Sequence, residues 1–193
     1  SIEMVVSGIT ANSFTTASGT WFVGARTGYL NKAYGFYYNP QQQQFYYAFG
    51  NVMPSNKYDS SALYNVQKTI KLDPSGLYVD GTKVVSQSAQ NFSAPVPLSL
   101  FGLNNNGGTI SLTSFKLYSF KIWQDGNLVR DYIPVLDLNN AACLYDKMTE
   151  RLFYNSGTGE FNYATIEEEY REVGYIESTG TEWINTGYAI NTA

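Results

Sequence analysis

Apolar and polar positions alternate from the first residues of the chain. In the opening SIEMVV, Ile2, Met4 and Val6 fall on one face of an extended segment, and Glu3 and Val5 fall on the other. A period of two residues is typical of a β-strand with one buried face. The pattern therefore predicts a strand that is already under way at the first residue.

Two further segments have the pattern of hairpins. Residues 35–50, GFYYNPQQQQFYYAFG, predict two aromatic strands around an Asn-Pro-Gln turn, with Phe45, Tyr47 and Phe49 on one face of the second strand. In residues 76–86, GLYVDGTKVVS, an Asp-Gly pair stands between apolar runs. Asp-Gly favours the tight turns that match the twist of a two-stranded ribbon.

The longest alternation covers residues 110–137 and predicts two long antiparallel strands around the turn Asp125 and Gly126. Residues 141–161 predict a last hairpin, with its turn at residues 146–150. The alternation predicts one face of the first long strand that holds Leu112, Ser114, Lys116, Tyr118, Phe120 and Ile122.

Composition supports an all-β fold. Aromatic residues make up 16% of the 193 residues, with 17 Tyr, and runs of good helix formers are rare. Short strands separated by Gly, Asn and Asp are typical of a two-sheet antiparallel sandwich or jelly roll, rather than of a βαβ fold. We expect about a dozen strands in residues 1–163, followed by an acidic connector over residues 164–173 with one or two helical turns.

Charge and residue usage exclude several functions. The net charge is −4 and the 12 Lys and Arg are scattered, so no basic stripe is available for nucleic acid. No apolar run approaches the roughly 20 residues that cross a bilayer. The chain has no His, which removes Ser-His-Asp and Cys-His catalysis and the commonest zinc ligand. We expect the single cysteine, Cys143, to be a buried thiol.

Three stretches resemble concanavalin A-like, laminin G-like jelly rolls, a version of which is common in surface proteins of gut bacteria and in tail or appendage proteins of their phages. They are GLYVDGTKV (76–84), SLTSFKLYSFKIWQDGNLVRDYIPVLD (111–137) and CLYDKMTERLFYNSGTGEF (143–161). The resemblance implies a concanavalin A-like sandwich and an extracellular location, on a bacterial surface appendage or a phage virion.

The end of the chain resembles the beginning of such a domain. In that family a phrase like YIESTGTEWINTGY, here residues 175–188, comes first, directly ahead of a strand like SIEMVV. We therefore expect residues 174–193 to supply the first strands that residues 1–163 lack. The residues expected to make this assembly strand are Tyr175, Ile176, Trp183, Ile184, Tyr188 and Ile190.

Three destinations for this segment remain open. It completes its own domain, as in a circular permutant; it enters the next copy, as pilin donor strands do; or it belongs to an adjacent repeat of a longer tandem array. Insertion into a neighbour is head-to-tail and does not close, so it would extend into a filament. The expected partners are thus copies of this chain or adjacent repeats.

The strands show no carboxylate pattern typical of a catalytic site. Concanavalin A-like folds include glycosidases, which need two carboxylates about 5 Å apart, but no Glu-x-Asp-x-x-Glu pattern occurs in the strands, and we expect no enzyme activity. The acidic residues of the second half stand in or near turns, where solvated carboxylates are expected; they are Asp131, Asp137, Asp146 and Glu160.

Exposed aromatic rings could stack on sugars and bind surface glycans. The candidate glycan-binding residues are Trp21, Tyr29, Tyr34, Tyr37, Tyr46 and Trp123, although each also suits the core or a sheet edge. We expect no cofactor. Calcium is the one ion that the resemblance suggests, with oxygen ligands from Asn104, Asn105 and Asn106 together with Asp73 or Asp80, although NNNGG is foremost a turn sequence.

The sequence thus favours a non-enzymatic, extracellular structural or adhesive module, assembled head-to-tail by strand complementation or by tandem repetition into a fibre or appendage. The alternative is a glycan-binding module of a phage tail protein or bacterial adhesin. The two hypotheses depend on different residues, those of the C-terminal segment and the exposed aromatic rings.

Overall fold

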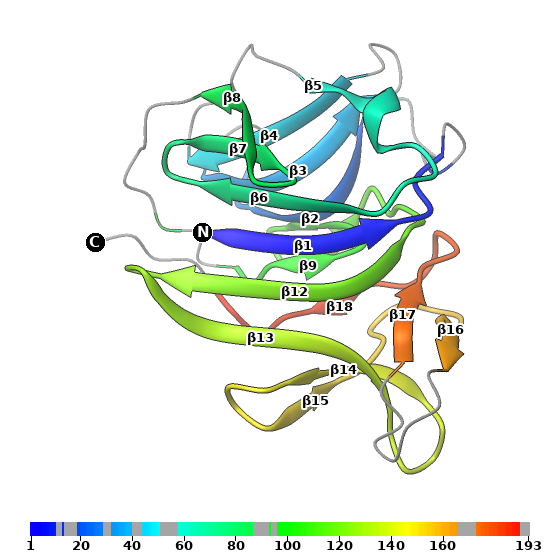
Figure 1. Ribbon diagram of the computed structural model, residues 1–193. Helices are drawn as coiled ribbons and strands as arrows, with labels where there is room; N and C mark the ends of the chain where they lie inside the picture. The colour runs from blue at the N-terminus through cyan, green and yellow to red at the C-terminus, as the bar shows by residue number, and fades with distance from the viewer. Residues whose placement is uncertain are drawn as a thin grey trace.

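Strands make up nearly all the regular structure of the chain (Figure 1). The computed structural model describes residues 1–10, 13, 19–28, 32–39, 44–50, 58–86, 93, 96–165 and 173–189. In these residues the strands are β1 (Ile2–Ser7), β2 (Thr20–Arg26), β3 (Ala33–Asn39), β4 (Gln44–Gly50), β5 (Tyr58–Asp59), β6 (Lys68–Asp73), β7 (Gly76–Val79), β8 (Thr82–Ser86), β9 (Ser99–Leu100), β10 (Leu103–Asn105), β11 (Gly108–Ile110), β12 (Lys116–Gln124), β13 (Asn127–Leu136), β14 (Ala142–Asp146), β15 (Arg151–Phe153), β16 (Asn162–Thr165), β17 (Val173–Glu177) and β18 (Ile184–Asn185). A single 3-10 turn, η1 (Ser60–Leu63), is the only helical element among them.

The strands form two sheets. The larger has the order β15-β14-β13-β12-β1-β6-β7-β8, and β17 adds to β12 and carries β16. The smaller has the order β11-β10-β2-β3-β4-β5, and β9 adds to β2 and carries β18. Neighbouring strands are antiparallel except for β10 and β2, which are parallel. The described part of the chain is therefore all-β, as the composition predicted. Within residues 1–163, the described strands already outnumber the dozen expected, because several of them have only two or three residues.

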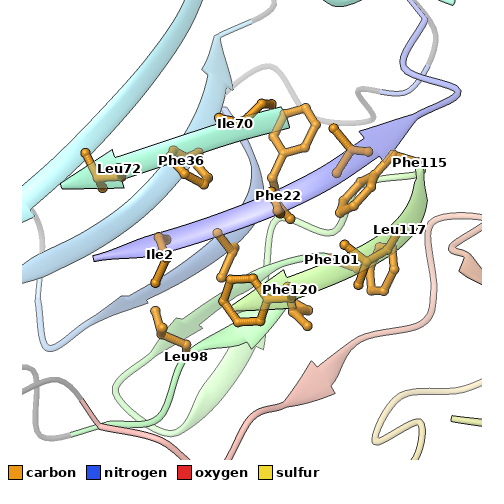
Figure 2. Close-up of a cluster of buried hydrophobic side chains, with 14 of the residues drawn as sticks. Ile2, Phe22, Phe36, Ile70, Leu72, Leu98, Phe101, Phe115, Leu117 and Phe120 are labelled. Atoms are coloured by element: carbon orange, nitrogen blue, oxygen red, sulfur yellow. The ribbon is translucent and has the colours of Figure 1, made fainter. Parts of the chain in front are cut away.

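One hydrophobic core lies between the two sheets (Figure 2). Phe22 of β2 lies 5.1 Å, centroid to centroid, from Phe115, which precedes β12, and Phe115 lies 4.5 Å from Phe101. Ile2 of β1 and Phe120 of β12 face the same layer and are fully buried. Because side chains of both sheets meet in one continuous layer, the two sheets form a β-sandwich.

The opening alternation is confirmed. Ile2, Met4 and Val6 of β1 are fully buried, whereas Glu3 and Val5 are only partly so. β1 pairs with β6 on one side and β12 on the other, which places it in the middle of the larger sheet. A strand in this position needs one fully apolar face, which the period of two provides.

The unbroken alternation expected in the first long strand is wrong. Leu117 is buried on the same side of the sheet as Phe120 and Ile122, although it stands three and five positions before them, and odd spacings alternate faces in a regular strand. The register against β1 shifts here: Val5 pairs with Ser119 and Val6 with Leu117. Such a shift is a β-bulge, in which one extra residue moves the later side chains to the other face.

The Asp-Gly turns are confirmed. β7 and β8 pair across Asp80 and Gly81, whose φ angles are +48° and +76°, and β12 and β13 pair across Asp125 and Gly126 with φ of +51° and +80°. Two consecutive positive φ values define the type I′ turn that this dipeptide favours. β14 and β15 also pair as expected around residues 147–150.

Several expectations fall outside the described residues. They concern most of the acidic connector (166–172), Tyr29 and Ile190. In the part of the chain that the structure does describe, no helix has the length and apolarity to cross a membrane.

Candidate functional site: the C-terminal segment

Residues 173–189, here called the C-terminal segment, contribute a strand to each sheet of their own chain. β17 pairs with β12 through Ile176 and Glu177, and β18 pairs with β9 through Ile184, opposite Leu100 (Figure 1). Past β18, the Thr186 amide donates to the Leu98 carbonyl at 2.9 Å. The segment is thus hydrogen-bonded to both layers of the sandwich.

Apolar residues of the segment belong to the common core. Ile176 and Ile184 are fully buried, and Val173 is nearly so. Burying an Ile side chain contributes about 1.5–3 kcal/mol, so the two Ile together supply a large part of a typical domain's net stability of about 5–15 kcal/mol. Removing the segment would expose the core between β9 and β12.

A compact loop joins β17 to β18, and Glu182 is its centre. The Glu182 carboxylate is buried, and it accepts hydrogen bonds from the Thr179 amide and the Thr181 hydroxyl, both at 2.7 Å, and from the Ser178 hydroxyl at 3.2 Å. Burial alone would raise the pKa of Glu182, but these hydrogen bonds favour the ionised form more strongly and hold the pKa below its usual value. Residues 178–182, here called the Glu182 loop, are therefore held together by a buried charge.

The Glu182 loop packs on the loop that follows β15. The Trp183 carbonyl accepts from the Ser156 amide at 3.1 Å. Space between the two loops is small: a Cβ on Gly157 would lie 2.4 Å from the Thr181 carbonyl oxygen, and one on Gly159 would lie 2.7 Å from Glu182 Oε1. The glycines of NSGTGEF are thus needed for this approach.

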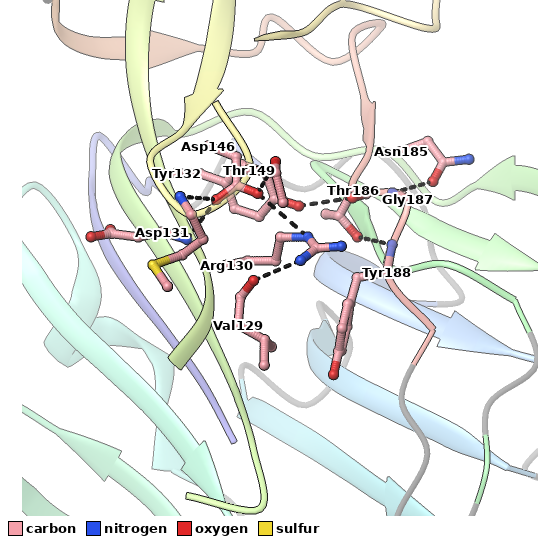
Figure 3. A network of polar contacts seen from close by, with 11 residues as sticks. Val129, Arg130, Asp131, Tyr132, Asp146, Thr149, Asn185, Thr186, Gly187 and Tyr188 are labelled. Atoms are coloured by element: carbon pink, nitrogen blue, oxygen red, sulfur yellow. Dashed lines mark hydrogen bonds and ion pairs between the residues drawn. The ribbon is translucent and has the colours of Figure 1, made fainter. Parts of the chain in front are cut away.

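A buried acid organises the strands that receive the segment (Figure 3). Asp146 is fully buried and accepts from the Asp131 amide at 3.0 Å, the Met148 amide at 3.1 Å and the Thr149 hydroxyl at 2.6 Å. Arg130 Nε lies 3.4 Å from Asp146 Oδ2. The expectation of a solvated carboxylate at Asp146 is wrong, because the acid closes its own turn and pairs with Arg130 beneath the segment.

The segment touches this network through Tyr188 and Thr186 (Figure 3). The Arg130 guanidinium lies 5.1 Å from the centroid of the Tyr188 ring, within the range of a cation–π contact. The Tyr188 hydroxyl also donates to Gln124. The Tyr132 hydroxyl donates to the Thr186 carbonyl at 2.8 Å, and burial raises the pKa of this phenol far above its usual value. The sequence did not single out Arg130 or Tyr132, because no local pattern marks their contacts with Tyr188 and Thr186, more than fifty residues away. Glu182 was missed as well, although its hydrogen-bond partners are local, because its burial depends on how the loop packs.

The remaining described residues of the predicted assembly strand, Tyr175 and Trp183, are only partly buried. Tyr175 is half-buried, with its ring 4.2 Å from Lys116 Nζ and 5.7 Å from the Tyr118 ring. Trp183 is half-buried against Gly157. Tyr175 stands on β17 and pairs with Ala164 of β16, whereas Trp183 lies in the loop directly before β18.

The structure brings together three of the predicted glycan-binding residues. Trp21, Tyr37 and Tyr46 stand side by side on β2, β3 and β4, with ring centroids 4.8 Å and 5.0 Å apart. Trp21 is 5% exposed and Tyr46 is 9% exposed, and a Cβ on Gly24 would lie 2.3 Å from the Trp21 ring. The faces of Trp21 are therefore covered by protein, and a sugar would meet little of this stack.

The other two described members of that set lie apart from the stack. Tyr34 is fully buried in the core, with its ring 5.1 Å from that of Phe49. Trp123 is half-buried on β12, with Lys71 Nζ 5.9 Å from its ring. The six residues thus do not form one common surface in the described part of the chain.

The oxygen ligands suggested for calcium serve other purposes. Asn104 is buried, donates to the Pro97 carbonyl and accepts from the Gly107 amide. Asp73 accepts from Ser75, and Asp80 pairs with Lys68 at 2.6 Å. Within the residues described here, no group of three or more His, Cys, Asp or Glu is placed to hold a metal ion.

Comparison with known proteins found no protein-family model, no curated protein and no solved structure that matches the chain.

Proposed function

We propose that this chain is a non-enzymatic, extracellular structural or adhesive module with a concanavalin A-like jelly-roll fold, built into a fibre or appendage by its C-terminal segment. The observation that supports the proposal is the pairing of this one segment with both sheets, through Ile176 against β12 and Ile184 against β9. In the sequence resemblance, residues 175–188 correspond to the opening strands of the family, which agrees with a role in completing a sandwich.

Assembly follows from exchange of the segment between copies. The groups that receive it, such as the Leu98 carbonyl and the Tyr132 hydroxyl, belong to residues that precede it in the chain. The segment of another copy has the same sequence, so it can make the same hydrogen bonds to these receiving groups. Because the donor and acceptor surfaces differ, exchange in one direction is head-to-tail and extends into a filament.

A pair of cysteines tests this directly. Asn185 faces Ser99 across the antiparallel ladder, where Cα atoms are about 4.5–5.5 Å apart, within the range that a disulfide spans. The variant Ser99→Cys with Asn185→Cys is unfolded, refolded at increasing protein concentration, oxidised and separated on a non-reducing gel. We expect a ladder of covalent oligomers that lengthens with concentration, because each exchanged segment links two chains.

The controls separate exchange from random oxidation. Each single-cysteine variant can form at most a dimer through its new thiol. Cys143 is fully buried, and burial together with the nearby Asp137 carboxylate raises the pKa of its thiol to about 11, so it contributes little thiolate at neutral pH. A doubly substituted protein that cross-links only within one chain at every concentration would contradict fibre formation by exchange.

A further inference from the structure

An open groove lies at one end of the larger sheet, outside the C-terminal segment. Its walls are the turn between β13 and β14, the residues that follow β15, and the chain entering β16. Its volume is about 460 Å³, within the roughly 300–1,000 Å³ of small-molecule sites. Neither the predicted assembly strand nor the aromatic stack of β2, β3 and β4 contributes a side chain to it.

Two tyrosine rings are exposed in this groove. Tyr154 is 46% exposed and Tyr163 is 43% exposed, among the largest exposures of any aromatic residue that the structure describes. Phe161 lies between them in the sequence, is 5% exposed and packs on Phe101, which anchors this wall to the core. The groove therefore offers aromatic surface on a fixed support.

The charge of the groove is negative. Among the described residues that line it, Glu160 is the charged one, and it is exposed. Asp137 lies just behind: it accepts from the Ala141 and Asn139 amides, both at 2.8 Å, and from the Tyr154 hydroxyl at 3.1 Å. The hydrogen bond from Ala141, followed by the others, holds the pKa of Asp137 below its usual value, so this carboxylate is ionised at neutral pH.

The bond between Tyr154 and Asp137 also changes the ring. A phenol that donates its proton to a carboxylate gains electron density, which makes the face of the ring more negative. A negative ring face attracts cations. The hydroxyl is at the same time engaged, so Tyr154 presents its ring rather than a free donor.

The side-chain amide of Asn155, one of three asparagines that line the groove, is already in use. Asn155 Oδ1 accepts from the Gly157 amide at 2.9 Å, and its Nδ2 donates to the Gly159 carbonyl at 2.9 Å. A sugar ring needs donors and acceptors in combination, whereas a carboxylate only accepts. A carboxylate beside aromatic ring faces therefore suits a positively charged group that can only donate hydrogen bonds.

We propose that this groove binds an organic cation, an alkylammonium or guanidinium group such as the head of a Lys or Arg side chain, between the rings of Tyr154 and Tyr163 and paired with Glu160. The methylene stem of such a ligand lies on the ring faces, and its charge meets the carboxylate. All residues that line the groove precede the C-terminal segment. Cation binding there would therefore be a function separate from assembly.

Agmatine, which carries a guanidinium and an ammonium on a four-carbon stem, is the probe. It is titrated into the isotopically labelled full chain, and backbone amide resonances are followed by NMR. We expect saturable shifts confined to residues 139–142 and 154–163. Glu160→Gln and Tyr163→Ala should each weaken binding roughly two- to fivefold, and the exposed Leu152→Ala, outside the groove, should leave it unchanged.

The alternatives give different results. Both substituted side chains are exposed, so amide shifts elsewhere in the spectrum should stay in place and show that the fold is intact. Lactose, a neutral disaccharide, should produce no shifts in these residues at the same concentrations. Equal binding of lactose, agmatine binding that Glu160→Gln does not weaken, or no agmatine shifts at all would each overturn the proposal.

Discussion

The hydroxyl of Tyr132, in the middle of β13, donates a 2.8 Å hydrogen bond to the backbone carbonyl of Thr186 in the C-terminal segment, and both residues are fully buried. This bond joins the centre of the larger sheet to a segment that reaches the smaller one. A buried carbonyl needs such a partner, because leaving it unpaired costs about 1–3 kcal/mol. The receiving strands are therefore matched to the segment in polar groups as well as in shape.

Tyr132→Phe should lower the free energy of unfolding by about 1–3 kcal/mol, because it leaves the Thr186 carbonyl buried without its donor. Urea unfolding followed by Trp fluorescence measures the change. Tyr163→Phe, at a position 43% exposed, removes a hydroxyl of the same kind and should stay within about 0.5 kcal/mol of the parent. Equal effects of the two substitutions would show that the bond to Thr186 does not hold the segment.

Ile184→Ala should destabilise the chain by about 2–5 kcal/mol, because a fully buried side chain between the sheets is replaced by a cavity. Ile184→Val should cost only about 0.5–1.5 kcal/mol. The same unfolding measurement applies, with Val66→Ala, at a side chain 42% exposed, as the control. If Ile184→Ala behaves like the control, the segment does not complete the core in solution.

Stability should fall in acid through Glu182. Its pKa is lower in the folded chain than in the unfolded chain, so the ionised carboxylate stabilises the fold above the unfolded value of 4.5, and this contribution is lost as the pH falls through the folded pKa. The free energy of unfolding, measured in urea between pH 7 and pH 3, should decline in that window.

Glu182→Gln should cost about 1–3 kcal/mol at pH 7, because an amide accepts fewer of the loop's hydrogen bonds, and it should flatten the acid decline. Glu160→Gln, at an exposed position, removes the same charge and should leave both values nearly unchanged. An acid decline that is equally steep with and without Glu182 would assign the pH dependence to other groups.

Gly35→Ala should destabilise the smaller sheet by more than about 3 kcal/mol. Gly35 has a φ of +136°, and a Cβ there would lie 2.0 Å from the Val23 carbonyl oxygen on β2. Gly28→Ala is the matched control, since a Cβ there meets nothing within 4 Å. Thermal unfolding should show a large loss for the first substitution and almost none for the second.

The strands and their tight turns could be predicted because their signals are local. The alternation in β1 and the Asp-Gly pairs at residues 80–81 and 125–126 act within a few residues, through the pleat and through φ angles that Gly adopts at low cost. The same local rules failed at Tyr118, where the register shifts between Val5 and Val6. A bulge depends on the partner strand, which lies more than one hundred residues away in the chain.

The candidate sites were harder to predict than the strands, because each is formed by residues that are far apart in the sequence. The sequence suggested that Trp21, Tyr37 and Tyr46 could stack on sugars. In the structure these rings stack on one another, and Trp21 and Tyr46 are almost fully buried. Tyr154 and Tyr163 drew no attention in the sequence, because exposure is a property of the assembled surface. The groove arises only where three separate stretches meet.

Periodicity and turn chemistry thus predicted an all-β chain of hairpins, and the sequence resemblance added the expectation that residues 174–193 supply a domain's opening strands. Only the tertiary structure decided that residues 173–189 pair with both sheets, that Asp146 and Glu182 are buried, and that Glu160 lines one groove with two exposed tyrosines. The physical reason is the separation along the chain over which each interaction acts. Backbone preferences act between neighbours in the sequence, whereas burial, charge pairing and cavities are set by groups that folding alone brings together.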